Sequence, residues 1–236
     1  MRLLVLFVFV PFLFSNDSTN NDHLIADCDK SIEVNLDERN FSKTFNGTFN
    51  NKKITYTASL KEKILYEKDK PNSPLASFFY TEYIASDNKN RPIIFSFNGG
   101  PGSASLWLHM GVLGPKVIKV PSNASDDGAA PYKIIDNNLS PLSYADLVFI
   151  DPIGTGYSRT LGCHDPKQFW GVNEDPKIIA EFIRRWITDN KRWNSPRYIL
   201  GESYGGIRGP LLVSELRSGS ITPIEINGLL LVAPAS

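Results

Sequence analysis

The sequence is poor in the residues that hold metals and redox groups. It contains two cysteines and three histidines among 236 residues. The histidines, His23, His109 and His164, lie far apart and lack the spacing of metal ligands. We therefore expect no metal and no organic cofactor, and we expect each histidine to be exposed or to serve in packing.

Neither sign of charge is in excess. The chain has 25 Lys and Arg against 25 Asp and Glu, so its formal net charge is zero and no basic surface indicates nucleic-acid binding. Repeats, heptads and low-complexity tracts are also absent. With 42% hydrophobic residues, the chain is long enough for one large domain with a substantial core.

No apolar run is long enough for a stable membrane span. The longest, Leu3–Phe14, follows Arg2 and has twelve residues, whereas a spanning helix needs about 20. This pattern predicts a signal peptide over residues 1–15. The alternative is an uncleaved anchor, since no A-x-A cleavage pattern appears near Ser15.

Features typical of secreted proteins follow. Cys28 and Cys163 could pair with each other, or either could pair with a cysteine beyond residue 236. We expect a secreted, periplasmic, lysosomal or vacuolar glycoprotein. Its N-x-S/T sequons are Asn16, Asn40, Asn46, Asn123 and Asn138.

The pattern of apolar residues changes near Pro92. Residues 16–50 are rich in Asn, Asp, Ser and Thr and predict a loosely ordered polar lead-in to a domain over 51–236. An antiparallel meander is predicted for Lys53–Leu60, Lys63–Tyr66 and Ser77–Ala85. Strands of a parallel sheet, buried on both faces, are predicted for Pro92–Phe97, Leu147–Asp151, Tyr198–Leu200 and Leu229–Val232.

Two helices complete the predicted α/β fold. Asp175 as N-cap and Pro176 at the first position begin an amphipathic helix. A second helix is expected from Tyr204 to Leu216, with a bend near Pro210. Strand–helix–strand alternation after a meander predicts a mostly parallel central sheet with antiparallel N-terminal strands.

The most informative motif is Gly201-Glu202-Ser203-Tyr204-Gly205, directly after the strand Tyr198–Leu200. It is typical of a nucleophile elbow, the sharp strand-to-helix turn that exposes a serine hydroxyl. Such a serine needs a histidine base and a carboxylate, which follow it in folds of this kind. All three histidines precede Ser203. The sequence therefore predicts the attacking half of an acyl-transfer site without its base.

Two glycine-rich loops end other predicted strands. Asn98–Ser103, which reads N-G-G-P-G-S, has backbone amides free to bind a developing oxyanion. Asp151–Ser158 permits a sharp exit from its strand at the carboxyl end of the sheet, where ligands usually bind. Each loop taken alone would be interpreted as a tight turn.

Together these segments resemble the serine carboxypeptidases, peptidase family S10, of the α/β-hydrolase fold. The likeness covers residues 91–232 and includes Leu113-Gly114-Pro115. Phe169-Trp170-Gly171 and Trp193-Asn194-Ser195-Pro196 look most like the bacterial-type branch of the family. Only the N-terminal part of the family's fold is represented.

The resemblance implies a role for each of six residues. Ser203 would attack the scissile carbonyl, and the backbone amides of Gly100 and Tyr204 would form the oxyanion hole. The free carboxylate of a peptide substrate would be bound by Asn98, Glu202 and the backbone of Gly99. Because two carboxylates repel unless one carries a proton, binding is expected to be best at acidic pH.

Two departures weaken the expected carboxylate site. Ser96 stands where many eukaryotic members have tryptophan, and Val112 stands where many have an acidic residue before L-G-P. Exopeptidase preference is therefore less firmly implied than hydrolase chemistry. No oligomeric state is predicted.

The resulting hypothesis is a serine-type carboxypeptidase that releases C-terminal residues through an acyl-enzyme on Ser203. This chain, lacking the acid and base, is expected to be a fragment that is inactive or nearly so, and poorly soluble because its last strand is an exposed apolar edge. One alternative is a carboxypeptidase-like acyltransferase, which uses an alcohol in place of water. The other is a non-catalytic peptide-binding protein.

Overall fold

A mixed β-sheet forms the centre of the computed structural model, which describes residues 37–235 except 88–89, 122, 124, 126–127 and 219–221. The predicted signal peptide, His23, Cys28 and most of the polar lead-in lie outside the described residues. Cys163 is disulfide-bonded. No helix among the described residues has the length and hydrophobicity needed to cross a bilayer.

The sheet changes from antiparallel to parallel pairing at β7. Its strands lie in the order β1-β2-β3-β7-β4-β9-β10, with the short β8 beside β3. The strands are β1 (Asn40–Phe49), β2 (Lys52–Tyr66), β3 (Pro74–Ala85), β4 (Ile93–Phe97), β7 (Asp146–Ile150), β8 (Arg159–Thr160), β9 (Arg197–Glu202) and β10 (Gly228–Val232). Pairing is antiparallel from β1 to β7 and parallel from β7 through β4 and β9 to β10. The predicted α/β class is confirmed.

The prediction of a loosely ordered polar lead-in is wrong at the C-terminal end of that segment. Residues Asn40–Phe49 are not loosely ordered but form β1, which pairs with β2 along its whole length. Its polar side chains are mostly exposed, whereas Phe45 and Phe49 pack against Tyr56 at ring distances of 5.8 and 5.7 Å. Pairing with a neighbouring strand therefore outweighs a composition that favours disorder.

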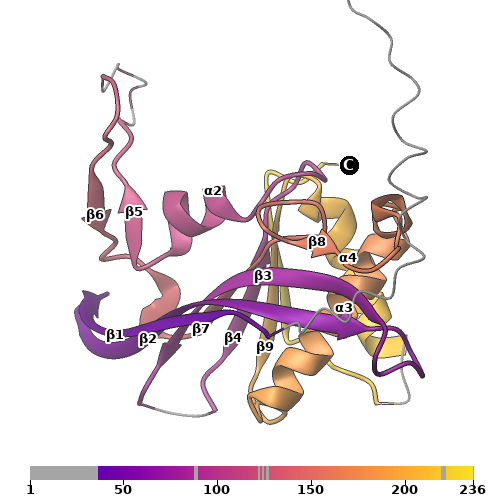
Figure 1. Ribbon diagram of the computed structural model, residues 1–236. Coiled ribbons are helices and arrows are strands. Elements are labelled where there is room, and N and C mark those ends of the chain that lie inside the picture. The colour runs from indigo at the N-terminus through magenta and orange to yellow at the C-terminus, as the bar shows by residue number, and fades with distance from the viewer. Residues whose placement is uncertain are drawn as a thin grey trace, which may run out of the picture. The chain divides into compact units, whose positions relative to one another are not determined.

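Helices cover the sheet on both faces (Figure 1). α3 (Glu174–Asp189) and α4 (Gly205–Ser218) contribute to one core cluster, and α2 (Leu106–Leu108) to the other. α2 continues as the π-helix η1 (His109–Leu113), and the 3-10 helices are η2 (Pro141–Ser143) and η3 (Pro166–Phe169). The predicted helix start is wrong, because the N-cap position of α3 is Asn173, whose side chain makes no capping bond, and Asp175 and Pro176 both lie inside the first turn.

Strand β7 shows why the predicted parallel strands are continuous apolar runs and do not alternate apolar with polar residues. Val148 and Ile150 belong to the core cluster beneath α3 and α4, whereas Leu147 and Phe149 belong to the cluster on the opposite face. Every residue of β7 is buried. A strand covered on both faces has no solvent-facing side that would require polar residues.

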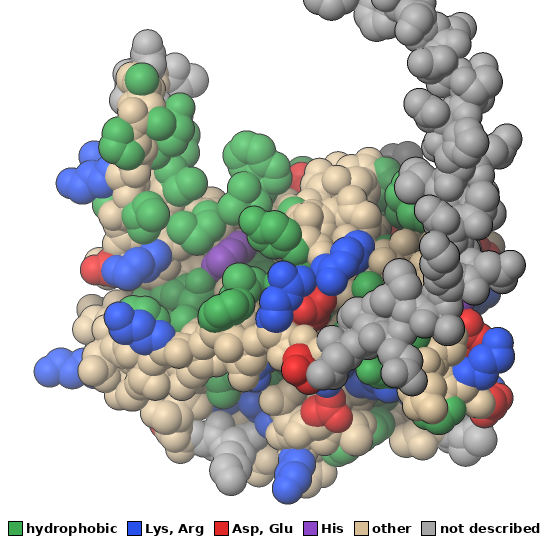
Figure 2. Space-filling view, in the orientation of Figure 1, with side chains coloured by type: hydrophobic (Ala, Val, Ile, Leu, Met, Phe, Trp, Pro, Cys, Tyr) green, Lys and Arg blue, Asp and Glu red, His purple; other side chains and the backbone are tan. Residues whose placement is uncertain are grey.

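Two apolar surfaces remain exposed. Side chains of β10, from Leu229 to Val232, are 37–45% exposed. Others gather over α2 and the hairpin of β5 (Lys116–Ile118) and β6 (Ile134–Asp136), where Trp107 is 71% exposed (Figure 2). The exposed edge supports the prediction of poor solubility, which stays a prediction. Glycosylation and secretion also stay predictions. The described sequon residues Asn40, Asn46, Asn123 and Asn138 are all exposed, as glycosylation would require.

His109 is a packing histidine. Its ring stacks on Phe149 at 4.7 Å, and its Nε2 lies 2.6 Å from the hydroxyl of Tyr83. Burial lowers the pKa of His109 from 6.5 to about 4. The unfolded chain therefore binds a proton that the folded chain excludes, so stability is full above pH 6.5 and falls as the pH decreases toward 4.

Within that window, we expect each decrease of one pH unit to lower the free energy of unfolding by up to about 1.4 kcal/mol, because His109 excludes the proton. Urea unfolding of wild type and His109→Phe at pH 6.5, 5.5 and 4.5 measures it. The variant should show a flatter pH dependence, because it has no imidazole to protonate. Parallel pH profiles for the two proteins would contradict the assignment.

Candidate active site

The strand–turn–helix geometry predicted around Ser203 is present. β9 ends at Glu202, α4 begins at Gly205, and Ser203 between them has a φ of 54°, in the left-handed region. A Cβ on Gly201 would lie 2.8 Å from the carbonyl oxygen of Gly205 and 2.9 Å from the ring of Phe97. The turn therefore requires glycine at this position.

The loop after β4 packs directly against this turn. β4 and β9 are neighbouring parallel strands, with Phe97 opposite Gly201, so both turns leave the same end of the sheet. A Cβ on Gly99 would lie 2.6 Å from the amide nitrogen of Tyr204 and 2.7 Å from Cβ of Ser203. This close approach brings the two predicted motifs into one site.

Three of the predicted residues are joined by hydrogen bonds. Glu202 Oε2 accepts from Asn98 Nδ2 at 3.1 Å and from the amide of Gly99 at 3.2 Å. The other end of the Asn98 amide group accepts from the amide of Leu108 at 3.1 Å. Asn98 is fully buried and Glu202 partly exposed. The carboxylate is therefore held in a fixed position beside Ser203.

The third predicted motif, Asp151–Ser158, supports a neighbouring element. Asp151 Oδ1 accepts from the amide of Ser105 at 2.8 Å, and the Ser105 hydroxyl donates to the carbonyl of Ile150. Burial raises the pKa of Asp151, and the bond from Ser105 opposes that rise. Gly156, with a φ of 55°, passes too close to the Asp151 carboxylate to carry a side chain. These contacts fix the start of α2.

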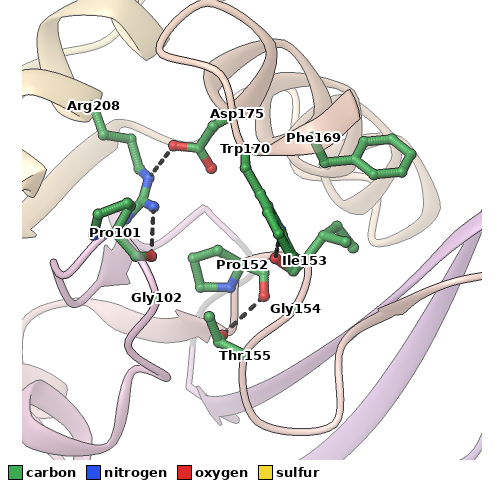
Figure 3. A pocket seen from close by; sticks show the side chains of 10 residues that line it. All are labelled: Pro101, Gly102, Pro152, Ile153, Gly154, Thr155, Phe169, Trp170, Asp175 and Arg208. Atoms are coloured by element: carbon green, nitrogen blue, oxygen red, sulfur yellow. Dashed lines mark hydrogen bonds and ion pairs between the residues drawn. The ribbon is translucent and has the colours of Figure 1, made fainter. Parts of the chain in front are cut away.

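A pocket of about 350 Å³ is lined in part by Pro101 and Gly102 of the Asn98–Ser103 loop. Its walls include Pro101, Ile153 and Trp170, and the indole of Trp170 donates to the carbonyl of Ile153 at 3.2 Å (Figure 3). Asp175 and Arg208 also line it and form an ion pair at 2.6 Å. Burial raises the pKa of Asp175, against the opposing effect of Arg208.

The two departures from the family pattern have different surroundings. Ser96 is fully buried, and its hydroxyl has no hydrogen-bond partner among the described residues. Val112 is 60% exposed, on η1. Neither contributes to the hydrogen bonds that hold Glu202, which come instead from Asn98 and Gly99.

No described histidine is bonded to Ser203. His109 is bonded to Tyr83, and His164 Nε2 lies 3.2 Å from a carboxylate oxygen of Glu67. Within the described residues, no group of three His, Cys, Asp or Glu side chains is arranged to hold a metal ion. The sequence reasoning missed Ser105 and Arg208, because a lone serine and a lone helical arginine carry no local signal.

Comparison with known proteins agrees with these motifs. The sequence profile of the serine carboxypeptidase family matches residues 56–235. Two Arabidopsis thaliana proteins, serine carboxypeptidase-like 9 and 8, are each 30% identical to the chain. The alignments cover 66% and 67% of this chain but only 36% and 37% of those relatives. The chain thus spans little more than a third of their length.

A solved structure shows the same fold. It is the Kex1(delta)p prohormone-processing carboxypeptidase of Saccharomyces cerevisiae, 24% identical, with a TM-score of 0.55. The match covers 75% of this chain and 38% of that one. The family profile extends over most of the chain and includes both the loop and the turn that meet at Ser203. The chain therefore belongs to the serine carboxypeptidase family and has the α/β-hydrolase fold.

Proposed function

We propose that this chain supplies the nucleophile and the substrate-carboxylate site of a serine-type carboxypeptidase. The observation that carries the proposal is the contact of Glu202 with Asn98 and Gly99 immediately beside Ser203. A carboxyl group held next to a nucleophile suits a substrate whose scissile bond lies one residue from a free carboxylate. An internal peptide bond presents no such group.

The chemistry follows from the arrangement of the two turns. The Ser203 hydroxyl oxygen bonds to the carbonyl carbon, while a base takes its proton and the carbonyl electrons move onto the oxygen. The amides of Gly100 and Tyr204 donate to that oxyanion. The C–N bond then breaks, the leaving amine takes the proton, and water hydrolyses the resulting ester.

Among the described residues, none is assigned as the base or the acid. His109 and His164 are held by Tyr83 and Glu67. The relatives are nearly three times as long as the part aligned with this chain. The activity is therefore proposed for the complete protein that the gene encodes, which is the form to be tested.

Binding of the substrate carboxylate requires a proton between it and Glu202. Glu202 Oε2 already accepts two hydrogen bonds, so Oε1 is the atom left to carry that proton and donate it to the substrate. Two ionised carboxylates at this distance would repel each other. The proposed site therefore favours acidic conditions.

We expect Glu202→Gln to remove the pH dependence of KM for peptides with a free C-terminus, because an amide mimics the protonated carboxyl group. Glu202→Ala should raise KM at acidic pH about tenfold or more, since it removes a hydrogen bond to a charged group. Steady-state kinetics between pH 4 and 7 on matched free and C-terminally amidated peptides measures both effects.

Amidated peptides are the control, because they lack the carboxylate that Glu202 would recognise. Equal kcat/KM for free and amidated peptides would contradict the carboxypeptidase assignment. Product analysis with an acyl ester and an alcohol distinguishes the acyltransferase alternative. Peptide binding without any labelling of Ser203 by a fluorophosphonate would identify a non-catalytic binding protein.

A further inference from the structure

Arg208 is a charged residue in the core next to the proposed site. It lies on the first turn of α4, five residues after Ser203, and only 1% of its side chain is exposed. A charge buried this deeply is costly unless every part of it is bonded. The contacts of the guanidinium therefore indicate what it does.

Two of those contacts are to the glycine-rich loop after β4. Nη1 donates to the carbonyl oxygen of Asn98 at 2.8 Å, and Nη2 donates to that of Pro101 at 3.3 Å (Figure 3 shows the second). These carbonyls stand on either side of Gly99 and Gly100. The planar guanidinium thus bridges the loop across the residue proposed to donate to the oxyanion.

The guanidinium is itself held in place from three directions. Nε donates to Asp175 Oδ2 at 2.6 Å, and Asp175 is fixed in the first turn of α3. The rings of Phe97 and Tyr204 lie 5.2 Å from the guanidinium carbon. Arg208 therefore links α3, the loop and the residue that follows the nucleophile.

The loop needs such support because its sequence does not impose one conformation. Gly99, Gly100 and Gly102 lack the Cβ that restricts other residues, and Gly100 has a φ of 108°. A peptide unit is planar, so fixing its carbonyl fixes the N–H on its other side. Arg208 holds the Asn98 carbonyl while Glu202 accepts from the Gly99 amide of the same peptide unit.

We propose that Arg208, anchored by Asp175, is a positioning residue that orients the Asn98–Pro101 loop so that the Gly100 amide points at the oxyanion. Buried ion pairs often add little to stability compared with apolar residues of similar size. The bonds to the two carbonyls are instead those expected of a geometric support. This inference rests on the proposed function of Ser203.

The test compares three forms of the complete protein: wild type, Arg208→Met and Arg208→Lys. We expect Arg208→Met to react with a fluorophosphonate about 100-fold more slowly, and to lose kcat by a similar factor with little change in KM. Arg208→Lys should recover part of the rate, because an ammonium can pair with Asp175 but cannot reproduce the bidentate fork. Arg208→Lys also provides the test if Arg208→Met does not fold.

Arg192→Met is the matched control. Arg192 is also buried, and it pairs with Asp146 at 2.7 Å near the opposite end of β9 from Ser203. The Arg192→Met substitution should lower the melting temperature but leave the fluorophosphonate labelling rate of the folded protein unchanged. A folded Arg208 variant, Met or Lys, that is labelled at the wild-type rate overturns the role of Arg208. Absence of labelling in wild type instead overturns the proposed nucleophile.

Discussion

Replacing Ser203 with alanine is expected to lower kcat of the complete protein about 10⁶-fold, the size of loss found when a triad nucleophile is removed. Ser203 occupies the sharp turn between β9 and α4, and Gly99 packs against its Cβ. Alanine keeps that Cβ and removes only the hydroxyl. Turnover of a peptide with a free C-terminus, with fluorophosphonate labelling in parallel, measures the loss.

Ser203→Gly separates chemistry from backbone strain. A non-glycine residue at a φ of 54° costs about 1–3 kcal/mol when the surroundings impose that conformation. Both variants should be equally inactive, whereas the glycine variant should have the higher unfolding free energy of the two. If Ser203→Ala kept more than a hundredth of wild-type kcat, the nucleophile would have to be another residue.

Asp146→Ala is expected to destabilise the protein by about 3–5 kcal/mol, because it leaves buried positive charge without its partner. Asp146 is fully buried at the start of β7. Its Oδ1 accepts from Arg91 Nε at 3.1 Å and from the amide of Ala85 at 3.0 Å. Its Oδ2 accepts from Arg192 Nη1 at 2.7 Å.

The network around Asp146 joins four segments of chain. Arg192 also donates to the carbonyl of Arg91 at 2.7 Å, and Arg91 donates to the carbonyl of Leu142 at 2.5 Å. The ends of β3 and β7 and the segments preceding β4 and β9 thus depend on one carboxylate. Arg91 keeps its ion pair with Asp87 at 3.1 Å, whereas the buried Arg192 loses its ion pair with Asp146.

Urea unfolding followed by far-UV circular dichroism measures this effect. Asp136→Ala is the control, because Asp136 forms an ion pair with Lys116 in which both side chains are at least half exposed. That substitution should change the unfolding free energy by less than about 0.5 kcal/mol. Equal destabilisation by the two substitutions would show that Asp146 is not the centre of a buried network.

Local signals made the elbow and the loop predictable from sequence. Glycine is required at 201 because a side chain there would collide with the backbone of Gly205, four residues further along the chain. The apolar run of β7 and its neighbours predicted buried parallel strands, because such strands are covered on both faces. These are properties of short segments, and short segments can be read without knowing their partners.

The pattern of polar residues was less informative. β1 lies in a stretch whose composition indicates disorder, and only its pairing with β2 makes it a strand. Asp175 has the residue type of an N-cap, but its carboxylate bonds to Arg208, 33 residues later in the chain. A polar side chain has several possible partners, and the sequence alone does not identify which one the fold supplies.

The sequence by itself determined the α/β class, the family and the convergence of Ser203 with the glycine loop. The class and the elbow could be predicted because the burial of apolar strands and the steric limit on Gly201 act over a few neighbouring residues. The family, and with it the expected meeting of Ser203 and the loop, came from the resemblance of the motifs to serine carboxypeptidases. Only the tertiary structure decided that Arg208 bridges two carbonyls of that loop, with Asn98 110 residues away. Contacts over such separations depend on how β4, β9 and the helices pack, and no local pattern encodes them.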